Sequence, residues 1–190
     1  MKKVFLLLAA VIVSVSAVNA QYAFNRGDLV FNAMIGIGNN LYSGSNYKTT
    51  VIPLAVSGEY GVVDDLFNNG NGAIGVGGIL GVSGGKVRRY DQFAGEFGVK
   101  STSVVLAARG VFHYEFVDRL DTYAALTLGV DIVNSRAYGT HTGPALSLDS
   151  SGFMAGFCVG ARYYFTDSFA VAAELGYGLA TLSLGVAYKF

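Results

Sequence analysis

The sequence predicts an all-β protein, an eight-stranded antiparallel up-and-down β-barrel that crosses a membrane. Three observations lead to this prediction. The chain begins with the pattern of an export signal, its remainder is apolar and glycine-rich without an apolar helix, and segments of alternating hydrophobicity recur along its whole length. We expect a signal peptide over residues 1–20 and one barrel domain over residues 21–190.

Residues 1–20 have the three parts of a cleaved secretory signal peptide. Two lysines precede an apolar run over residues 4–13, and small residues follow up to Ala20, so Gln21 is the expected first residue after cleavage. A single membrane anchor is the alternative, but the run is shorter than the roughly 20 residues that a spanning helix needs. The protein is therefore predicted to leave the cytoplasm.

The composition is unusual for a soluble domain. Charged residues make up 14% of the 190-residue chain, against about 25% in ordinary globular proteins, and the mean hydropathy is +0.45. The chain has 26 Gly, 13 Phe and 12 Tyr, but after the signal it has no apolar run of about 18 residues that would make a spanning helix. Strands that alternate between a lipid face and a lumen face explain these features together.

The charge balance argues against nucleic acid as a partner. Without the two signal lysines, 11 basic residues are balanced by 13 acidic ones, a net charge of about −2. Cys158 is the sole cysteine of the sequence, so an internal disulfide is excluded.

The first four strands are expected between residues 29 and 116. Apolar residues occupy alternate positions, and glycine or polar residues occupy the positions between them, which is the period of a strand with one face in lipid. The stretch LVFNAMIGIG, for example, puts Phe31 and Ile35 on one face and Asn32 on the other. The four ranges are 29–38, 51–62, 73–82 and 103–116.

The last four strands repeat the pattern. In TYAALTLGVDIV, Leu126 and Leu128 alternate with Thr127 and Gly129. Each segment is about as long as a strand that crosses a bilayer. The four ranges are 122–133, 152–165, 169–178 and 181–190.

The connections between these strands alternate in length. Tight turns follow the fourth and sixth strands, and the connection over residues 63–72 is intermediate. Long loops on one side and short turns on the other are typical of bacterial outer-membrane barrels, whose termini lie on the short-turn, periplasmic side. The long loops are expected over residues 39–50, 84–100 and 134–150.

Outward-facing aromatic residues gather at the short-turn ends of the predicted strands. Amphipathic rings favour the headgroup level of a bilayer, so a belt at one height is expected of a barrel in lipid. The predicted belt contains Tyr60, Phe112, Tyr114, Phe116, Tyr163, Phe165, Phe169, Tyr188 and Phe190. Phe153 and Tyr177 supply a thinner ring at the other side, and lipid is expected to bury Phe190 at the end of the last strand.

The chain resembles the small eight-stranded outer-membrane barrels of Gram-negative bacteria, the OmpX/OmpA/OmpW-like group. Its opening NRGDLVFNAMIGIG looks most like the outer-membrane β-barrel proteins of Bacteroidetes. The family's last strand carries a polar residue, a glycine two positions later and aromatics five and seven positions later, which match Ser183, Gly185, Tyr188 and Phe190. The resemblance implies a porin-like fold in the cell outer membrane and recognition by the barrel-assembly machinery.

Seven charged residues are predicted to face the lumen: Glu59, Arg109, Glu115, Asp131, Arg162, Glu174 and Lys189. The interior of an eight-stranded barrel is just wide enough for side chains, and unpaired buried charge is costly, so these groups should pair. We expect a network centred on Arg109, Arg162 and Glu174, with Arg162 close to Glu174 across the short turn. A gated or narrow pore is the alternative, because inward glycines would leave water-filled gaps.

No catalytic, cofactor-binding or metal site is predicted. The match of GNGAIG, residues 70–75, to G-x-G-x-x-G opens a strand rather than a helix, so a turn is the better interpretation. His141 is the one candidate base for a lipid-modifying enzyme, since Thr140, Thr142 and Ser147 lie in the same loop. No group of His, Cys or acidic residues has metal-ligand spacing.

The second long loop carries a basic and aromatic surface-loop patch. Arginine suits phosphate and aromatic rings supply contact area, so the patch fits anionic lipopolysaccharide headgroups or a protein partner; the alternative is a plain solvated loop. Its residues are Lys86, Arg88, Arg89, Tyr90, Phe93 and Phe97.

The function predicted from these features is a non-enzymatic scaffold in the outer membrane that displays surface loops for adhesion, envelope integrity or partner binding. It would contact outer-membrane lipids and lipopolysaccharide. The alternatives are a narrow porin-like transporter for small hydrophobic molecules, as OmpW-like barrels suggest, and a lipid-modifying enzyme. A continuous lumen or a side opening would favour transport, and a His–Ser/Thr–acid cluster at the rim would favour an enzyme.

Overall fold

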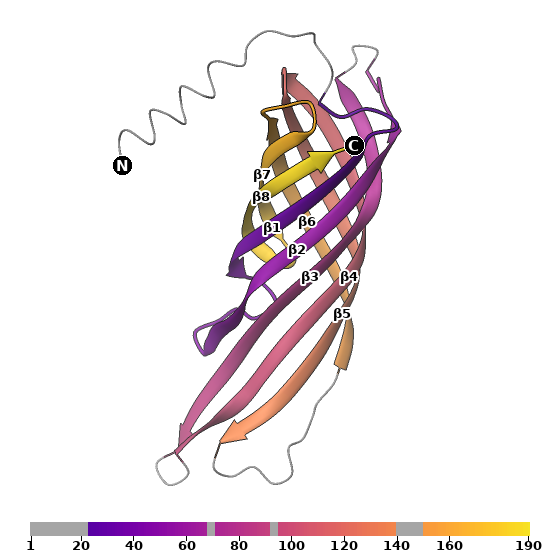
Figure 1. Ribbon diagram of the computed structural model, residues 1–190. Helices are drawn as coiled ribbons and strands as arrows, with labels where there is room; N and C mark the ends of the chain where they lie inside the picture. Colours follow the sequence, from indigo (N-terminus) through magenta and orange to yellow (C-terminus); the bar gives the residue numbers. More distant parts are fainter. Residues whose placement is uncertain (1–22, 68–70, 92–94, 140–149) are drawn as a thin grey trace, which may run out of the picture.

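The computed structural model is a single closed β-barrel (Figure 1). It describes residues 23–67, 71–91, 95–139 and 150–190. Each strand pairs antiparallel with its neighbours in the sequence, and the first strand pairs with the last, which confirms the predicted fold class. The strands are β1 (Leu29–Asn39), β2 (Tyr47–Val63), β3 (Gly72–Asp91), β4 (Gly95–Val117), β5 (Leu120–Gly139), β6 (Ser150–Tyr164), β7 (Phe169–Tyr177) and β8 (Ala180–Lys189).

Burial alternates along the strands as the sequence pattern predicts. On β5, the outward Leu126 and Leu128 are 63% and 56% exposed, whereas Ala125 and Thr127 between them are buried. An apolar side chain with this exposure is unfavourable in water, so the outer face is suited to lipid. In the described part of the chain, no helix has the length and apolar character needed to cross a bilayer.

The barrel wall is much taller on one side than on the other. β3, β4 and β5 run far past the ends of β1, β7 and β8, and their extensions project from the lower end of the barrel in Figure 1. We call this the extended end, and the opposite one the short-turn end. Phe190 and the beginning of the described chain lie at the short-turn end.

The extensions correct the predicted loop boundaries. The expected loop over residues 84–100 is mostly a strand pair, because β3 and β4 stay in register from Gly84↔Thr102 to Asp91↔Gly95. β5 likewise continues to Gly139, and β2 already begins at Tyr47. The predicted strands are shorter because the sequence pattern places each strand end at the last outward apolar residue. That boundary marks the edge of lipid, whereas the hydrogen-bond ladder between strands continues in water.

The barrel closes through the last residues of the chain. β8 pairs with β1 from Val30↔Lys189 to Asn39↔Ala180, and the backbone N–H of Phe190 donates to Leu29 O at 2.9 Å. The Phe190 ring is 72% exposed and meets Phe31 edge-on on the outer face. These contacts place Phe190 on the lipid-facing side, as predicted.

The aromatic belt is also present on the outer face at the short-turn end. Its exposed members are Tyr60, Phe112, Phe116, Phe169, Tyr188 and Phe190, and Phe67 from the β2–β3 connection joins them against Phe112 and Tyr114. Phe153 and Tyr177 are strongly exposed towards the extended end. Two aromatic levels with apolar residues between them match a barrel that crosses a bilayer.

Candidate functional site

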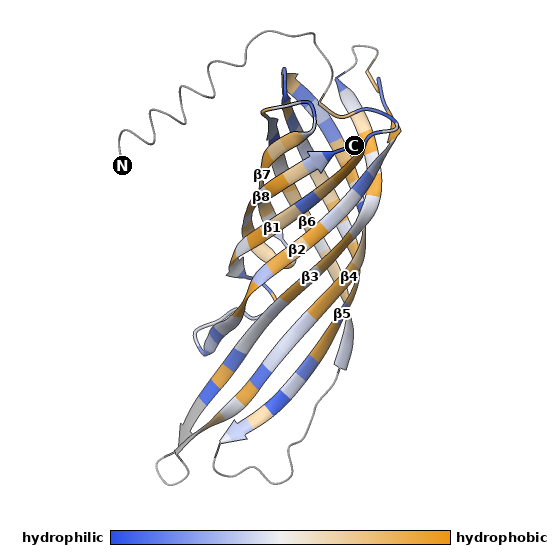
Figure 2. Cartoon of the chain, in the orientation of Figure 1, coloured by the Kyte–Doolittle hydropathy of each residue, from blue (hydrophilic) through white to orange (hydrophobic). Residues whose placement is uncertain are grey.

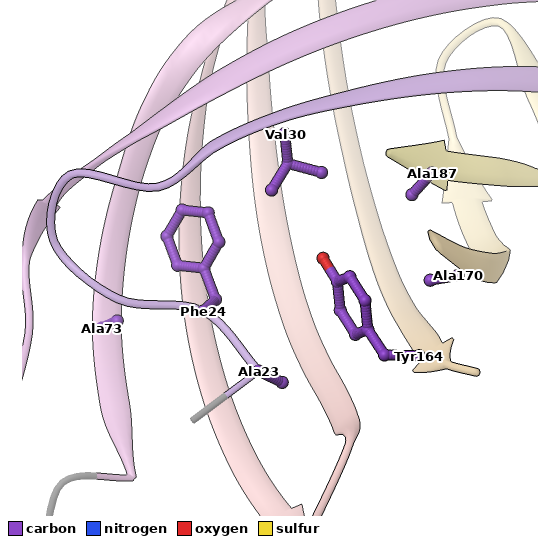
Figure 3. Packing of buried hydrophobic residues seen from close by; sticks show 7 residues of the cluster. All are labelled: Ala23, Phe24, Val30, Ala73, Tyr164, Ala170 and Ala187. Atoms are coloured by element: carbon purple, nitrogen blue, oxygen red, sulfur yellow. The ribbon is translucent and has the colours of Figure 1, made fainter. Parts of the chain in front are cut away.

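The lumen is closed at the short-turn end by the chain that precedes β1. Ala23 and Phe24 fold back inside the barrel, and Figure 3 shows their side chains converging there with those of five strand residues. The Phe24 ring stacks on His113, with ring centroids 3.9 Å apart and planes 15° from parallel. The seven residues of this apolar cluster are Ala23, Phe24, Val30, Ala73, Tyr164, Ala170 and Ala187.

Two of the predicted lumen charges fasten this segment. Glu115 accepts a hydrogen bond from the backbone N–H of Ala23 at 2.8 Å and another from Arg119 N–H at 3.1 Å. Lys189 donates from Nζ to Ala23 O at 3.2 Å and pairs with Asp28 at 3.6 Å. Both charges thus hold the backbone of the segment in place.

A cluster of four ionisable groups fills the lumen next to Phe24. The Arg162 guanidinium is fully buried, pairs with Glu59 and lies 3.1 Å from Asp121 Oδ2. His113 Nδ1 lies 2.8 Å from Asp121 Oδ1, and His113 Nε2 lies 3.8 Å from Glu59 Oε1. The cluster thus sets two carboxylates, those of Glu59 and Asp121, against one guanidinium and one imidazole, so these buried polar groups have partners in one another.

A second ion pair lies beside Tyr123. Arg109 Nη2 and Glu174 Oε1 are 2.5 Å apart, and the Tyr123 hydroxyl donates to the same carboxylate oxygen at 2.8 Å. The Tyr123 ring lies 4.3 Å from the Arg162 guanidinium carbon and 5.8 Å from that of Arg109. Cation–π contact with one ring thus links the two ion-pair clusters.

The register confirms the expected position of Arg162 relative to Glu174. Arg162 pairs with Ala172 and Glu174 with Gly160, so the two residues are diagonal neighbours across β6 and β7. The ion pairs, however, join Arg162 to Glu59 and Asp121, and Glu174 to Arg109. The Tyr123 ring occupies the space in front of Gly160.

The inward glycines hold large side chains rather than empty space. A Cβ on Gly160 would lie 2.4 Å from Tyr123 Cζ, and a Cβ on Gly75 would lie 3.2 Å from Phe24 Cζ. A Cβ on Gly81 would similarly lie 2.7 Å from a Leu179 methyl group. Aromatic rings and a branched side chain thus pack directly against these glycines. The space that a pore would need is occupied at these positions.

The lumen is also filled towards the extended end. Leu41 and Leu179, from the β1–β2 and β7–β8 connections, pack with Ile79 on a buried cluster of Val105, Ala107 and Met154. Between this cluster and the Arg109–Glu174 pair lies a cavity of about 60 Å³, also lined by Ser57 and Cys158. Its volume suits a few water molecules. Its lining includes neither Phe24 nor the Glu59, Asp121 and Arg162 side chains nearer the short-turn end.

A hydrogen-bonded chain lies beside the Leu41 contact. The Ser103 hydroxyl donates to Asp131 Oδ2 at 3.1 Å, and Tyr42 Oη lies 2.7 Å from Ser103 Oγ. Because the single Ser103 proton points to Asp131, Tyr42 must be the donor to Ser103. Burial raises the pKa of the Tyr42 phenol, which keeps its proton in place for this bond. Asp131, a predicted lumen charge, therefore helps to hold the β1–β2 connection over the lumen.

Three further residues of the lumen network were not among the predicted lumen charges: His113, Asp121 and Tyr123. His113 has the inward parity of Arg109 and Glu115 on β4, and Asp121 lies one residue before the predicted fifth strand over residues 122–133. β5 begins at Leu120, so Asp121 and Tyr123 share the inward parity of Thr127. Extending the alternation back by one residue would have found Asp121, whereas Tyr123 already faces inward within the predicted strand.

The described residues of the surface-loop patch lie on the β3–β4 extension and not on a loop. Lys86 and Arg88 belong to β3, and Phe97 belongs to β4. Arg89 and Tyr90 also fall within β3, whereas Phe93 lies outside the described residues. The described part of the patch is therefore built on a paired ribbon.

The other predicted residues divide between β8 and undescribed parts of the chain. Ser183, Gly185 and Tyr188 lie on β8, with Phe190 directly after it. The signal peptide and the His141 loop lie outside the described residues. Among the described residues, no group of His, Cys, Asp and Glu has the arrangement of a metal site.

Comparison with known proteins places the fold among small eight-stranded outer-membrane barrels. OprG, an outer-membrane protein of Pseudomonas aeruginosa, is 11% identical with a TM-score of 0.51, and the match covers 90% of this chain and 99% of that one. The N-terminal barrel domain of OprF from the same species is 17% identical with a TM-score of 0.44, covering 88% and 100%. Ail, the attachment invasion locus protein of Yersinia pestis, is 15% identical with a TM-score of 0.44, covering 87% and 99%. No protein-family model and no curated protein matches the sequence.

Proposed function

We propose that the protein is an integral barrel of the bacterial outer membrane that acts as a non-enzymatic scaffold and displays its extended strands at the cell surface. The observation that carries this proposal is the combination of an apolar outer wall with a lumen that side chains fill. A scaffold needs the first to stay in the membrane and has no use for an open channel.

The outer wall has the height of a bilayer core. Outward residues of β4 stay apolar or aromatic, apart from one glycine, from Tyr114 to Val104. This stretch measures about 34 Å along the strand and, at a tilt of about 40°, about 26 Å along the membrane normal. Outer-membrane barrels have apolar bands about 25 Å tall. Figure 2 shows the same band as orange segments across the middle of the strands.

The interior argues against transport. Phe24 and its cluster fill the short-turn end, two ion-pair clusters fill the middle, and Leu41 and Leu179 fill the extended end. A permeating solute would have to displace buried ion pairs, which is costly. The filled lumen therefore supports a structural role for the barrel.

The displayed element is the ribbon of β3, β4 and β5. It extends beyond the apolar band, and Figure 2 shows hydrophilic residues along its lower part. Under this proposal, the barrel-assembly machinery inserts the exported chain after removal of residues 1–20, and the ribbon then faces the outside of the cell. Function is placed there because exposed elements on a rigid scaffold commonly carry binding residues.

Electrical recording across a planar bilayer tests the proposal. The purified full-length mature chain should insert without producing stable single-channel steps. A variant with Phe24→Gly and Leu179→Gly, which removes one plug from each end, serves as the opened control and should conduct more than the wild type. Reproducible steps from the wild-type barrel would support the transporter alternative and overturn the scaffold proposal.

A further inference from the structure

Four basic residues form one row across the extended end. The register pairs Lys48 of β2 with Lys86 of β3, Lys86 with Lys100 of β4, and Lys100 with Arg136 of β5. Directly paired residues on neighbouring strands point to the same side of a sheet. The four side chains therefore lie side by side, in a set that we call the basic row.

The basic row is on the outer face of the wall. Arg136 has the parity of Leu128 and Ile132, which are exposed on the outside of β5. Lys100 has the parity of the outward Val104 and Leu106 on β4, and it pairs with Arg136. Lys48, Lys100 and Arg136 are exposed and Lys86 is partly so.

No acidic side chain of the described residues forms an ion pair with the basic row. Cβ atoms of directly paired residues lie about 5 Å apart, so four positive charges follow one another over roughly 15 Å. Like charges directly opposite each other destabilise a sheet. A row of this kind is an unfavourable feature of the isolated barrel and becomes favourable when anions lie against it.

The height of the basic row above the apolar band indicates which kind of anion it can reach. Each row residue of β3, β4 and β5 lies four positions beyond the last apolar outward residue, namely Val82, Val104 and Ile132. Four residues correspond to about 14 Å along the strand and, with tilt, to roughly 11 Å along the membrane normal. Lys and Arg side chains are long enough to reach back towards the headgroup layer, which is roughly 5–8 Å thick on each side of a bilayer.

We propose that the basic row binds the phosphate groups of anionic lipid headgroups in the membrane leaflet at the extended end. The inference rests on the proposed function, because it requires the barrel to span a bilayer. Phosphate oxygens accept charge-assisted hydrogen bonds from ammonium and guanidinium groups, and a row of four cations suits a headgroup that carries more than one phosphate. The row is continuous with the lipid-facing wall, which favours a lipid over a soluble anion.

Lipid binding in nanodiscs tests the proposal. The full-length mature barrel is placed in phosphatidylcholine discs, and its binding of added lipid A, a diphosphorylated lipid, is titrated by native mass spectrometry. The variant Lys86→Gln/Lys100→Gln removes the two central charges and should lower the affinity for lipid A roughly 20- to 30-fold. Arg26→Gln removes an exposed positive charge at the short-turn end and should leave the affinity unchanged.

Stability supplies a second readout. In phosphatidylcholine alone, the double variant should melt at the same temperature as the wild type or higher, because it lacks the repulsion between Lys86 and Lys100. Lipid A should raise the melting temperature of the wild type and of Arg26→Gln by more than that of the double variant. Phosphatidylglycerol at matched charge tests whether one phosphate per lipid is enough, and a response to it also supports the proposal.

Three outcomes overturn the proposal. Equal lipid A affinity of the wild type and the double variant would exclude the basic row as the lipid A site. An equal loss of lipid A affinity in Arg26→Gln would show that the total charge of the barrel, rather than the position of the charges, determines binding. Inorganic phosphate that stabilises the wild type as well as lipid A does would make the row a site for a free anion. Insertion is scored separately by the heat-dependent gel shift of folded barrels, so a barrel that does not insert at all identifies a failure of the proposed function.

Discussion

Replacing Arg162 with methionine is expected to destabilise the barrel by roughly 3–5 kcal/mol, because removal of one partner leaves charged groups buried without compensation. The Arg162 side chain has no solvent exposure, and Glu59 and Asp121 both depend on it for charge balance. The free energy of unfolding is measured by urea titration in vesicles, with folded and unfolded barrel separated by gel mobility.

The controls distinguish charge from packing. The triple variant Arg162→Met/Glu59→Gln/Asp121→Asn removes the stranded carboxylates and should recover much of the lost stability. Arg119→Met, at the β4–β5 turn, should have a small effect. If Arg162→Met unfolds at the wild-type urea concentration, the cluster is hydrated and does not behave as a buried network.

Leu128→Arg is expected to destabilise the inserted barrel by about 2–4 kcal/mol, the cost of an arginine at the bilayer midplane on a lipid-facing position. Leu128 is outward on β5, inside the apolar band, and 56% exposed on the outer wall. The same urea titration measures the effect. The matched control is Thr102→Arg, on the outer face of β4 beyond the apolar band, which should cost about 1 kcal/mol or less.

The choice of control follows from the filled lumen. Thr127 faces inward and pairs directly with Arg109, so an arginine there would be overpacked and would not isolate the effect of lipid. Equal destabilisation by Leu128→Arg and Thr102→Arg would contradict the placement of the bilayer along β5 and β4.

The barrel itself could be predicted because its signal is local. Alternation along each segment set the parity of residues such as Leu128 and Thr127, and the strand order follows from consecutive hairpins. Lumen-facing charges such as Arg109 and Glu174 were found by the same parity. Whether a residue faces the lumen depends only on the alternation within its own strand. One sequence is therefore sufficient to predict it.

Two features depended on more than one strand and were missed. The partners of Arg162 are set by the register of strands that are distant in sequence, which brings Glu59 of β2 and Asp121 of β5 to one guanidinium. Hydrophobicity alone marks the lipid boundary, so the sequence predicts loops where β3, β4 and β5 in fact extend. Polar strands in water keep the same backbone pairing but lose the apolar alternation on which the prediction relied.

The folding back of Phe24 into the lumen had no signal in the sequence. A single aromatic residue ahead of β1 is equally consistent with an exposed linker. Its position follows from the space that Gly75 leaves beside His113 and from the hydrogen bonds of Glu115 and Lys189 to Ala23. Only the assembled barrel brings these groups together.

A spin-label scan along β5 tests most directly whether the wall lies in lipid around a closed lumen. Single cysteines replace residues 124–132 one at a time in a Cys158→Ala background, and the labelled barrels are inserted into vesicles. Accessibility to oxygen should alternate with a period of two and be highest at Leu126, Leu128 and Val130, while a water-soluble nickel complex should reach neither face. Loss of the alternation, or nickel access at Thr127 and Gly129, would contradict a closed barrel embedded in a bilayer.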